Sequence, residues 1–301
     1  MFELIIIGAG PAGITAGVYA ARKKIDFLIV SEDIGGQTAL SADVENYTGY
    51  QFITGTELTA KFEEHLKQFD VQLKVSERVE RIDKLEGGGF SIKTDRSVYE
   101  ARSVIIASGR RPRWLEVAGE QEFRNKGISY CATCDGPLFS NKTVAVIGGG
   151  NSALDAVLQM IKIAQKIYLV NINLVLGGDT IMREKVETSP KVEILNKAVT
   201  KEIIGDKFVS AIKVEHAGAI KELKVEGVFV EIGSVPNSGI IDFVAKNANA
   251  EIIVDNLNRT NVAGVFAAGD VTDVPEKQII VAAGEGAKAV LGAFRYLSQQ
   301  G

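Results

Sequence analysis

The feature that most constrains the fold of this chain is a repeat. An apolar segment, a glycine-rich turn and a helical pattern occur at the N-terminus and again about half-way along. Residues 4–7 lead into the turn at residues 8–13, and residues 144–147 lead into the turn at residues 148–153. Glycines in such a turn let a pyrophosphate approach the backbone at the N-terminus of the following helix. Two copies therefore predict two dinucleotide-binding folds of the α/β class.

Each copy is followed by three segments of alternating polarity, which predict an antiparallel meander. They are residues 78–84, 90–94 and 98–101 after the first copy, and residues 199–204, 208–215 and 220–225 after the second. Each meander leads into an apolar strand that ends in glycine, at residues 104–109 and 228–233. We therefore expect two Rossmann-like domains of the three-layer ββα type.

A strand that ends in Gly269 and Asp270, and a long helical pattern through Val290 and Phe294, follow the second copy. Because this strand needs a sheet to join, we expect the second domain to be inserted into the first. The expected domains are residues 1–112 with 240–301, and the inserted residues 113–239. The crossings are expected at residues 110–113 and 235–238, whose composition favours turns.

The two cysteines of the 301-residue chain stand in the run Cys131-Ala132-Thr133-Cys134-Asp135. A pair at this spacing can cycle between dithiol and disulfide, with Asp135 placed as an acid–base group. A zinc site needs about four ligands, and both histidines lie far away in the sequence. A structural disulfide closing so short a loop would constrain the unfolded chain little. We therefore favour a redox-active pair over a metal site or a structural disulfide.

Composition limits the class of partner. The chain has 46% hydrophobic and 24% charged residues, as in ordinary globular proteins, and a net charge of −4. Nucleic-acid-binding domains are usually basic, so the charge argues against that role. The first apolar segment is too short for a signal peptide or a membrane span. We expect a cytoplasmic protein whose partners are small molecules and proteins.

Together the motifs resemble those of the low-molecular-weight thioredoxin reductases over nearly the whole chain. The matching elements are residues 8–13, 35–37, 44–46, 131–136, 148–153, 264–270, 278 and 282–286. The resemblance implies FAD on the outer domain, a nicotinamide cofactor on the inserted domain, a homodimer, and reduction of thioredoxin or a thioredoxin-like protein. It also implies that Cys134 faces the flavin, that Cys131 attacks the partner's disulfide, and that Asp135 is the acid–base residue.

The expected flavin-binding residues come from the dinucleotide motif at the first glycine turn and from the family resemblance. Glu32 stands about 20 residues past the first glycine turn, where an acid binds the ribose of a dinucleotide. Lys277 keeps the positive charge of an arginine that is more frequent in the family, but not its planar fork. Asn46 and Gln278 could equally cap a turn and start a helix. The full set of expected cofactor contacts is Gly8, Gly10, Pro11, Ala12, Gly13, Ser31, Glu32, Gly36, Gln37, Asn46, Val79 (its backbone against the adenine), Ala107, Gly109, Gly269, Asp270, Lys277, Gln278 and Ile279.

The inserted domain departs from the family pattern. In NADPH-dependent relatives the strand after the second glycine turn ends in a His-Arg-Arg-x-x-x-Arg run, and in NADH-dependent ones it ends in an acid. Here residues 166–170 lead into residues 171–179, which carry neither signature, and Arg183 is the first arginine after the strand. The departure makes NADPH doubtful. It favours a one-electron donor such as reduced ferredoxin, as in the ferredoxin-dependent flavin thioredoxin reductases and other deeply branching relatives.

Three alternatives stay open at this point. One is an NADPH-dependent thioredoxin reductase with a divergent nucleotide site. Another is the flavin component that recharges a peroxiredoxin, although such proteins usually carry an N-terminal thioredoxin-like module and this chain begins at the first glycine-turn strand. The third is a non-catalytic flavin redox sensor, against which the intact Cys131 to Asp135 motif counts.

Overall fold

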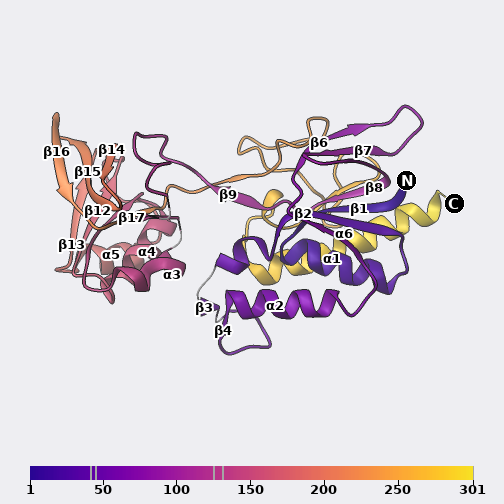
Figure 1. Ribbon diagram of the computed structural model, residues 1–301, viewed down its shortest axis with the longest axis horizontal. Helices are drawn as coiled ribbons and strands as arrows, with labels where there is room; N and C mark the ends of the chain where they lie inside the picture. Colours follow the sequence, from indigo (N-terminus) through magenta and orange to yellow (C-terminus); the bar gives the residue numbers. More distant parts are fainter. Residues whose placement is uncertain (41–42, 45, 125, 131, 301) are drawn as a thin grey trace. The chain divides into compact units, whose positions relative to one another are not determined.

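The computed structural model describes residues 1–40, 43–44, 46–124, 126–130 and 132–300 (Figure 1). They form two compact units: Met1–Arg111 with Val235–Gly301, and Pro112–Ser234. The chain passes between them through β9 (Arg110–Pro112) and β18 (Ser234–Pro236), which pair with each other. The inserted unit therefore has both of its ends in one two-stranded ribbon.

The return crossing lies at Ser234–Val235, whereas the sequence-based boundary was at residues 239/240. Hydrogen bonds explain the position. The Asn237 N–H donates to the Gly109 carbonyl at 2.9 Å, and the Ser238 hydroxyl donates to the Ala250 carbonyl at 2.6 Å. Residues that the turn-forming composition placed at the crossing are thus bonded into the first unit.

The first unit is built on a seven-stranded sheet of order β5-β2-β1-β8-β7-β6, with β19 paired to β8. The pairs among β5, β2, β1, β8 and β19 are parallel, and those from β8 to β7 and β6 are antiparallel. The pairing of β19 with β8 confirms that the second domain is inserted into the first. The elements are β1 (Phe2–Ala9), α1 (Pro11–Arg22), β2 (Phe27–Ile34), η1 (Gly36–Leu40), β3 (Asp43–Val44), β4 (Ile53–Thr54), α2 (Gly55–Leu66), β5 (Gln72–Val75), β6 (Val79–Lys84), β7 (Phe90–Thr94), β8 (Val98–Ile106), β19 (Val265–Ala267), η3 (Gly269–Val271) and α6 (Ile279–Gln299).

Strand β8 corrects one sequence-based expectation. Residues 98–101 and 104–109 were predicted as two strands, but residues 98–106 form a single one. Its first half pairs antiparallel with β7, and the rest pairs parallel with β1, so Ala101 faces both Phe90 and Phe2. The two residues between the predicted segments, Arg102 and Ser103, include neither glycine nor proline, so no turn interrupts the strand.

Strand β1 is buried on both faces of the sheet. Leu4 and Ile6 pack in a cluster with α1 and α6, and Ile5 and Ile7 pack in a second cluster that includes Phe90 of the meander. A strand that is covered on both faces has a continuous run of apolar residues, as β1 has.

The inserted unit repeats the plan. Its parallel sheet has the order β10-β17-β11-β12-β13, and β14, β15 and β16 form an antiparallel meander. The elements are β10 (Ile128–Ser129), α3 (Ala132–Asp135), η2 (Gly136–Phe139), β11 (Thr143–Ile147), α4 (Asn151–Ile161), β12 (Lys166–Asn171), α5 (Thr180–Glu187), β13 (Val192–Asn196), β14 (Ala198–Gly205), β15 (Val209–His216), β16 (Ala219–Lys224) and β17 (Gly227–Val230).

The inserted sheet also has two covered faces. Val144 and Val146 of β11 pack in a cluster with α4, whereas Ala145 and Ile147 pack in a cluster with Ile212 of the meander. Helix, parallel sheet and meander are thus three layers, which confirms the predicted ββα fold class. No helix among the described residues is both long and apolar enough to cross a membrane.

Candidate active site

The first glycine turn leaves open space at the N-terminus of α1. A Cβ on Gly13 would lie 1.8 Å from the Gly8 carbonyl oxygen, so only glycine lets α1 pack on the turn. A Cβ on Gly10 would meet no atom closer than the Gly35 carbonyl oxygen, at 3.9 Å. Gly10 is the N-cap of α1 and supplies no side-chain cap. The turn therefore forms a cradle that fits a pyrophosphate, whose charge would lie at the helix N-terminus.

We expect Gly10→Val to fold normally and to lose bound FAD. The backbone of Gly10 is extended (φ −77°, ψ −173°), so valine is tolerated there, but its side chain would fill the cradle. The measurement is flavin absorbance per chain after purification. Gly150→Val is the matched control, because Gly150 is the extended N-cap of α4 in the inserted unit and also faces open space. Full flavin occupancy in Gly10→Val would contradict the assignment.

The ends of three strands surround this turn. Ser31 in the second half of β2 is buried, and its hydroxyl accepts a hydrogen bond from the Ala9 N–H at 3.0 Å. Ala107 follows β8, and its carbonyl oxygen would lie 2.3 Å from a Cβ on Gly8. Gly269 follows β19, and a Cβ there would lie 3.1 Å from the Ala12 Cβ. The predicted contacts from these strands therefore converge on the turn, in which Pro11 begins α1.

Other predicted contacts are joined by hydrogen bonds between distant segments. The Asn46 amide donates to the Gln278 side-chain oxygen at 3.1 Å, across 232 positions of sequence. Gln278 is the N-cap of α6, and Ile279 is its first residue. The Gln37 amide donates to the Arg110 carbonyl at 2.9 Å, next to Gly109. These contacts bring the segment after β2 and the start of α6 to the same site.

Three further predicted contacts remain, and Gly36 is the one beside the cradle, since a Cβ there would lie 3.7 Å from the Gly10 Cα. Glu32 is exposed at the end of β2, and its carboxylate lies 3.7 Å from the Arg78 Nε. Val79 packs in the cluster that includes Ile7 at the end of β1. The Gly36 N–H donates to the Asp33 carboxylate at 3.2 Å. Glu32 is thus accessible to a ribose hydroxyl.

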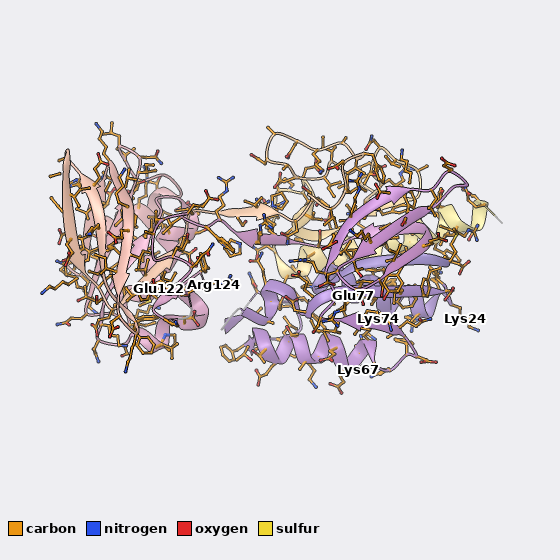
Figure 2. All side chains as sticks on the ribbon, turned by 45° about the horizontal axis from the view of Figure 1, so that its top comes forward. Lys24, Lys67, Lys74, Glu77, Glu122 and Arg124 are labelled. Carbon is orange, nitrogen blue, oxygen red and sulfur yellow. The ribbon has the colours of Figure 1, made fainter. Side chains whose placement is uncertain are left out.

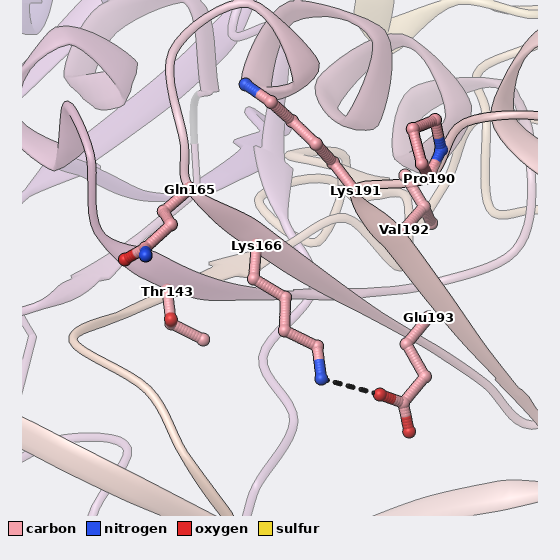
Figure 3. A pocket seen from close by; sticks show the side chains of 7 residues that line it. All are labelled: Thr143, Gln165, Lys166, Pro190, Lys191, Val192 and Glu193. Carbon is pink, nitrogen blue, oxygen red and sulfur yellow. Dashed lines mark hydrogen bonds and ion pairs between the residues drawn. The ribbon is translucent and has the colours of Figure 1, made fainter.

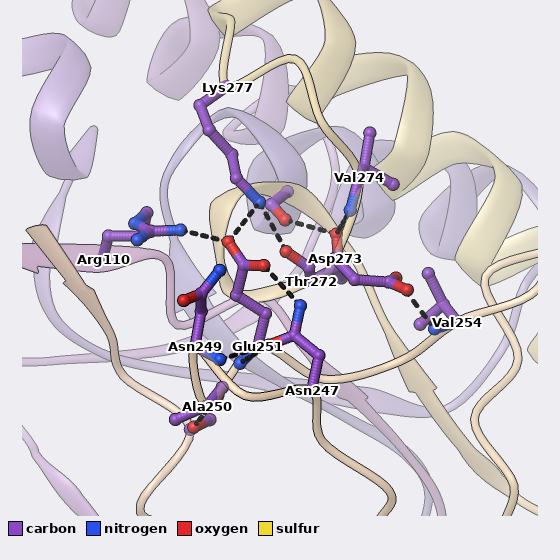
Figure 4. A network of polar contacts seen from close by, with 12 residues as sticks. Arg110, Asn247, Asn249, Ala250, Glu251, Val254, Thr272, Asp273, Val274 and Lys277 are labelled. Carbon is purple, nitrogen blue, oxygen red and sulfur yellow. Dashed lines mark hydrogen bonds and ion pairs between the residues drawn. The ribbon is translucent and has the colours of Figure 1, made fainter. Parts of the chain in front are cut away.

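A charged network joins Arg110, Glu251 and Lys277 (Figure 4). Glu251 is buried and bonded to Arg110, and its carboxylate lies 3.2 Å from the Lys277 ammonium. Burial raises the pKa of Glu251, but hydrogen bonds from Asn247, Arg110 and Lys277 outweigh it and hold the pKa below its ordinary value. Burial raises the pKa of Asp270, against the opposing charges of Lys277 and Arg110. Lys277 is thus a fixed positive charge near Asp270.

The second glycine turn is packed against the end of β12. A Cβ on Gly149 would lie 2.2 Å from the Asn171 side-chain oxygen. Asn171 is buried, and its amide donates to the Asn196 side chain at 2.8 Å and to the Asn173 carbonyl at 3.3 Å. Its side-chain oxygen accepts the Asn173 N–H. The Asn171 side chain, at the end of β12, therefore makes its hydrogen bonds within the protein.

Two charged residues that follow β12 in the chain, Arg183 and Asp179, also make hydrogen bonds within the protein. The guanidinium of Arg183 donates to the Leu176 carbonyl and to the Thr180 hydroxyl, both at 3.2 Å. The Asp179 carboxylate caps α5 by accepting the Ile181 and Met182 N–H groups. The loop from Asn171 to Asp179 exposes apolar side chains, namely Ile172, Leu174 and Val175, each more than 60% exposed.

The redox motif begins the short helix α3 against α4. Cys131 lies outside the described residues, and Cys134 belongs to α3. Ala132 is buried in the cluster that includes Met160 of α4, and a Cβ on Gly136 would lie 3.2 Å from the Met160 sulfur. Pro137 follows directly, and a proline disfavours helix at the residue before it, so α3 stays short. The motif is thus fixed to a helix of the inserted unit.

A buried carboxylate holds the segment before the motif. Glu120 is 3% exposed and accepts hydrogen bonds from the Leu115 N–H (2.8 Å), the Glu116 N–H (2.7 Å) and the Tyr130 hydroxyl (2.8 Å). Burial and the bond to Glu120 raise the pKa of Tyr130. Tyr130, the residue before Cys131, is thus anchored by its side chain.

We expect Glu120→Ala to destabilise the inserted unit by about 2–4 kcal/mol, because three partly buried hydrogen bonds to the buried carboxylate are lost. Urea unfolding followed by far-ultraviolet circular dichroism measures the effect. Glu122→Ala is the control, since Glu122 is exposed (Figure 2), and exposed substitutions typically change stability by less than about 0.5 kcal/mol. Equal stability of the two variants would show that the Glu120 bonds are not stabilising.

A depression of about 530 Å³ lies at the opposite ends of the inserted sheet's strands (Figure 3). Its lining includes Thr143 and Lys166, which begin β11 and β12, and Lys166 bonds to Glu193 across it at 2.7 Å. Ligands of open α/β sheets bind at the carboxyl ends of the strands. The depression is therefore not the predicted nucleotide site.

The sequence analysis missed Glu231. This residue follows the buried strand β17, next to the second glycine turn, and its carboxylate accepts a hydrogen bond from the Ala132 N–H in the redox motif. A Cβ on Gly148 would lie 2.2 Å from the Glu231 carbonyl oxygen. A charged residue directly after four apolar ones was the signal that could have found it.

Comparison with known proteins identifies relatives over nearly the whole chain. The family profile of pyridine nucleotide-disulphide oxidoreductases matches residues 2–286. The chain is 40% identical to an NADH dehydrogenase of Bacillus subtilis (strain 168) and to the F subunit of an alkyl hydroperoxide reductase of Pseudomonas putida. Each match covers 98% of this chain but only 58% of the relative. The chain thus spans about three fifths of the length of the curated relatives it matches.

Solved structures match this chain over nearly its whole length and nearly the whole of theirs. Thioredoxin reductase of Lactococcus lactis is 33% identical, with a TM-score of 0.86 over 99% of this chain and 100% of that one. Thioredoxin reductase of T. acidophilum is 36% identical, with a TM-score of 0.83 over 100% and 99%. A ferredoxin-flavin thioredoxin reductase of Clostridium acetobutylicum is 31% identical, with a TM-score of 0.55 over 99% and 98%. With its glycine turns, its inserted ββα unit and these matches, the chain belongs to the pyridine nucleotide-disulphide oxidoreductase family and has the fold of the low-molecular-weight thioredoxin reductases.

Proposed function

We propose that this protein is a flavin-dependent disulfide reductase that passes electrons from a donor, through FAD and the Cys131–Cys134 pair, to thioredoxin or a thioredoxin-like protein. The observation that carries the proposal is the open cradle at Gly10, on which the ends of three strands converge. The turn would hold the pyrophosphate of FAD, and Glu32 would bind its ribose. Bound FAD would supply the redox chemistry, and the protein would position it.

The chain's own part is thiol–disulfide exchange. In the dithiol state the Cys131 thiolate attacks the partner's disulfide, which forms a mixed disulfide and releases one partner thiolate. Cys134 then attacks the Cys131 sulfur, which releases the second partner thiolate and closes the Cys131–Cys134 disulfide. The partner leaves with two electrons, and its thiolates take up two protons. Asp135 would accept the proton of the Cys134 thiol before its attack.

Asp135→Asn is expected to lower turnover by about 10²–10⁴-fold, the usual contribution of a general acid–base group. The alternative role of Asp135 is a helix cap, and loss of a cap would lower stability but leave turnover of the folded protein nearly intact. Asp135 is the N-cap residue of η2, but its side chain makes no capping hydrogen bond, which favours the proton-transfer role. Turnover and melting temperature are measured on the same preparation. A lower melting temperature with normal turnover would favour the cap.

For the electron donor we propose a one-electron protein carrier, with reduced ferredoxin favoured over NADPH. The support is the end of β12, where Asn171 is bonded within the protein and Arg183 and Asp179 are both committed to other partners. A structural neighbour of this chain is a ferredoxin-flavin thioredoxin reductase. The exposed side chains of Ile172 and Leu174 occupy the strand end where NADPH-dependent relatives carry arginine.

An anaerobic reductive titration with dithionite tests the disulfide reductase itself, whatever the natural donor is. Full reduction should consume two electron pairs per chain, one for FAD and one for the disulfide. The double variant Cys131→Ser and Cys134→Ser should consume one. The reduced protein should then reduce thioredoxin. A wild-type chain that consumed a single pair and passed no electrons to thioredoxin would overturn the proposal.

A second candidate is a component that recharges a peroxiredoxin. The observation in its favour is the 40% identity to the F subunit of an alkyl hydroperoxide reductase over 98% of this chain. Transfer from the reduced protein to a peroxiredoxin, with and without added thioredoxin, separates the candidates. Electron transfer to the peroxiredoxin that is as fast without thioredoxin as with it would favour this second function.

We further propose that the protein is a homodimer, as the resemblance to the thioredoxin reductases implies. Light scattering coupled to size-exclusion chromatography measures the mass directly. A single species with the mass of one 32.3 kDa chain at micromolar concentration would contradict it.

A further inference from the structure

An exposed cation lies over two aromatic rings next to the redox motif. Trp114 is the single tryptophan of the chain and is 45% exposed. The Arg124 guanidinium lies over its ring, 5.5 Å from the centroid, and over the Tyr130 ring, 5.9 Å from the centroid. Arg124 is exposed (Figure 2), and Tyr130 directly precedes Cys131 in the chain. We call Trp114, Arg124 and Tyr130 the arginine stack.

The two rings of the arginine stack are held by hydrogen bonds of the inserted unit. The residues on either side of Trp114 are fixed by their backbones: the Arg113 N–H donates to a carbonyl after β17 at 2.9 Å, and the Leu115 N–H donates to the Glu120 carboxylate at 2.8 Å. The same carboxylate accepts the Tyr130 hydroxyl at 2.8 Å. Because these groups are ordered in advance, a partner that covers them loses little side-chain entropy on binding.

The charge of the arginine stack is available to a partner. No ion pair among the described residues includes Arg124. The exposed charges two positions away on either side, Glu122 and Lys126, offset each other. A guanidinium over aromatic rings keeps its charge and its planar fork of donors, which matches a carboxylate. Tryptophan, tyrosine and arginine are also the side chains that most often dominate binding energy in protein interfaces.

We propose that the arginine stack is a docking site for a carboxylate that the disulfide partner carries beside its disulfide. The inference rests on the proposed disulfide reductase function. Consecutive Cα atoms of a chain are about 3.8 Å apart, so a protein whose disulfide exchanges with Cys131 has to cover the surface beside Tyr130. The partner that fits is therefore a thioredoxin-like protein with an acidic side chain near its disulfide. A small disulfide would not reach the stack.

The test measures the rate of mixed-disulfide formation in the FAD-loaded Cys134→Ser protein, with oxidised thioredoxin at a concentration below saturation. Arg124→Gln should lower this rate by about 10- to 100-fold, the range for one lost charge-assisted hydrogen bond. Arg124→Glu should lower it further, because like charges repel. Bis(2-hydroxyethyl) disulfide is the second substrate, and with it both variants should react at the rate of the parent.

Three controls separate docking from a change of the motif itself. Lys224→Gln removes an exposed cation of β16 in the same unit and should leave the thioredoxin rate unchanged. Added salt should slow the parent more than Arg124→Gln, because it screens the exposed charge. Trp114→Ala keeps the charge but removes one ring under it, so it should slow the reaction with thioredoxin and not with the small disulfide.

Two results would overturn the inference. One is equal thioredoxin rates in the parent, Arg124→Gln and Arg124→Glu. The other is equal slowing of both disulfides by the variants, which would show an altered motif rather than a lost docking contact. Failure of the proposed function would look different, since the Cys134→Ser parent would then react with the small disulfide and form no mixed disulfide with thioredoxin.

Discussion

NADPH and NADH at micromolar concentration are expected to leave the flavin of this protein oxidised for minutes under anaerobic conditions, whereas reduced ferredoxin is expected to bleach it within seconds. The physical reason is the end of β12, where the strand runs into Asn171, Ile172 and Asn173 rather than into arginine or an acid. Downstream, the Arg183 guanidinium donates to the Leu176 carbonyl, and the Asp179 carboxylate caps α5. Charge-assisted hydrogen bonds contribute on the order of 1.5–3 kcal/mol each. Loss of two or three should weaken NADPH binding by several powers of ten.

A gain-of-function variant serves as the control. Ile172→Arg with Asn173→Arg restores two cations directly after β12, and the Ile172 side chain is 67% exposed, so the first change displaces no packed group. This variant should bind NADPH more tightly than the parent and not bind NADH more tightly, since NADH lacks the 2′-phosphate. Rapid bleaching of the wild-type flavin by micromolar NADPH, followed by turnover of thioredoxin, would contradict the donor assignment and place the chain among NADPH-dependent enzymes.

The two cysteine variants are expected to lose turnover and to fail in opposite ways. Cys134→Ser should accumulate a stable mixed disulfide with thioredoxin, because Cys131 can attack but no thiol resolves the product. Cys131→Ser should trap thioredoxin poorly, and its Cys134 thiolate should show charge-transfer absorbance with oxidised FAD. Non-reducing electrophoresis and visible absorption distinguish the variants. Identical behaviour in both assays would show that the roles are not divided in this way.

Much of the fold followed from the sequence because it depends on patterns that neighbouring residues carry. The glycine turns, the apolar β1 and the meander β14–β16 are local signals, and the structure contains all of them. Strand β8 was divided wrongly because its two halves have different partners, β7 and β1, and a change of partner leaves no turn signal. The insertion could be predicted because β19 and α6 follow the second repeat, and a single strand and helix have to join the sheet of an existing unit.

The site was harder to predict where side chains from distant segments meet. Asn46 and Gln278 were each ambiguous alone, and their hydrogen bond exists only in the fold. Glu231 was missed because its importance comes from Ala132, which is 99 positions away in the chain. For Arg183, sequence alone could not tell that the guanidinium would bind the loop before it.

The pairing of β19 with β8 sets an order for folding during synthesis. Domains generally fold as units as the chain emerges from the ribosome. The inserted unit, residues 112–234, is complete when residue 234 is available. The first unit, although it begins at residue 1, waits for β19 and α6, because α6 covers the same face of the sheet as α1 and β19 completes the sheet beside β8. Until then the sheet face that carries Leu4 and Ile6 has α1 but not α6 packed on it, so part of this apolar face stays exposed in the nascent first unit.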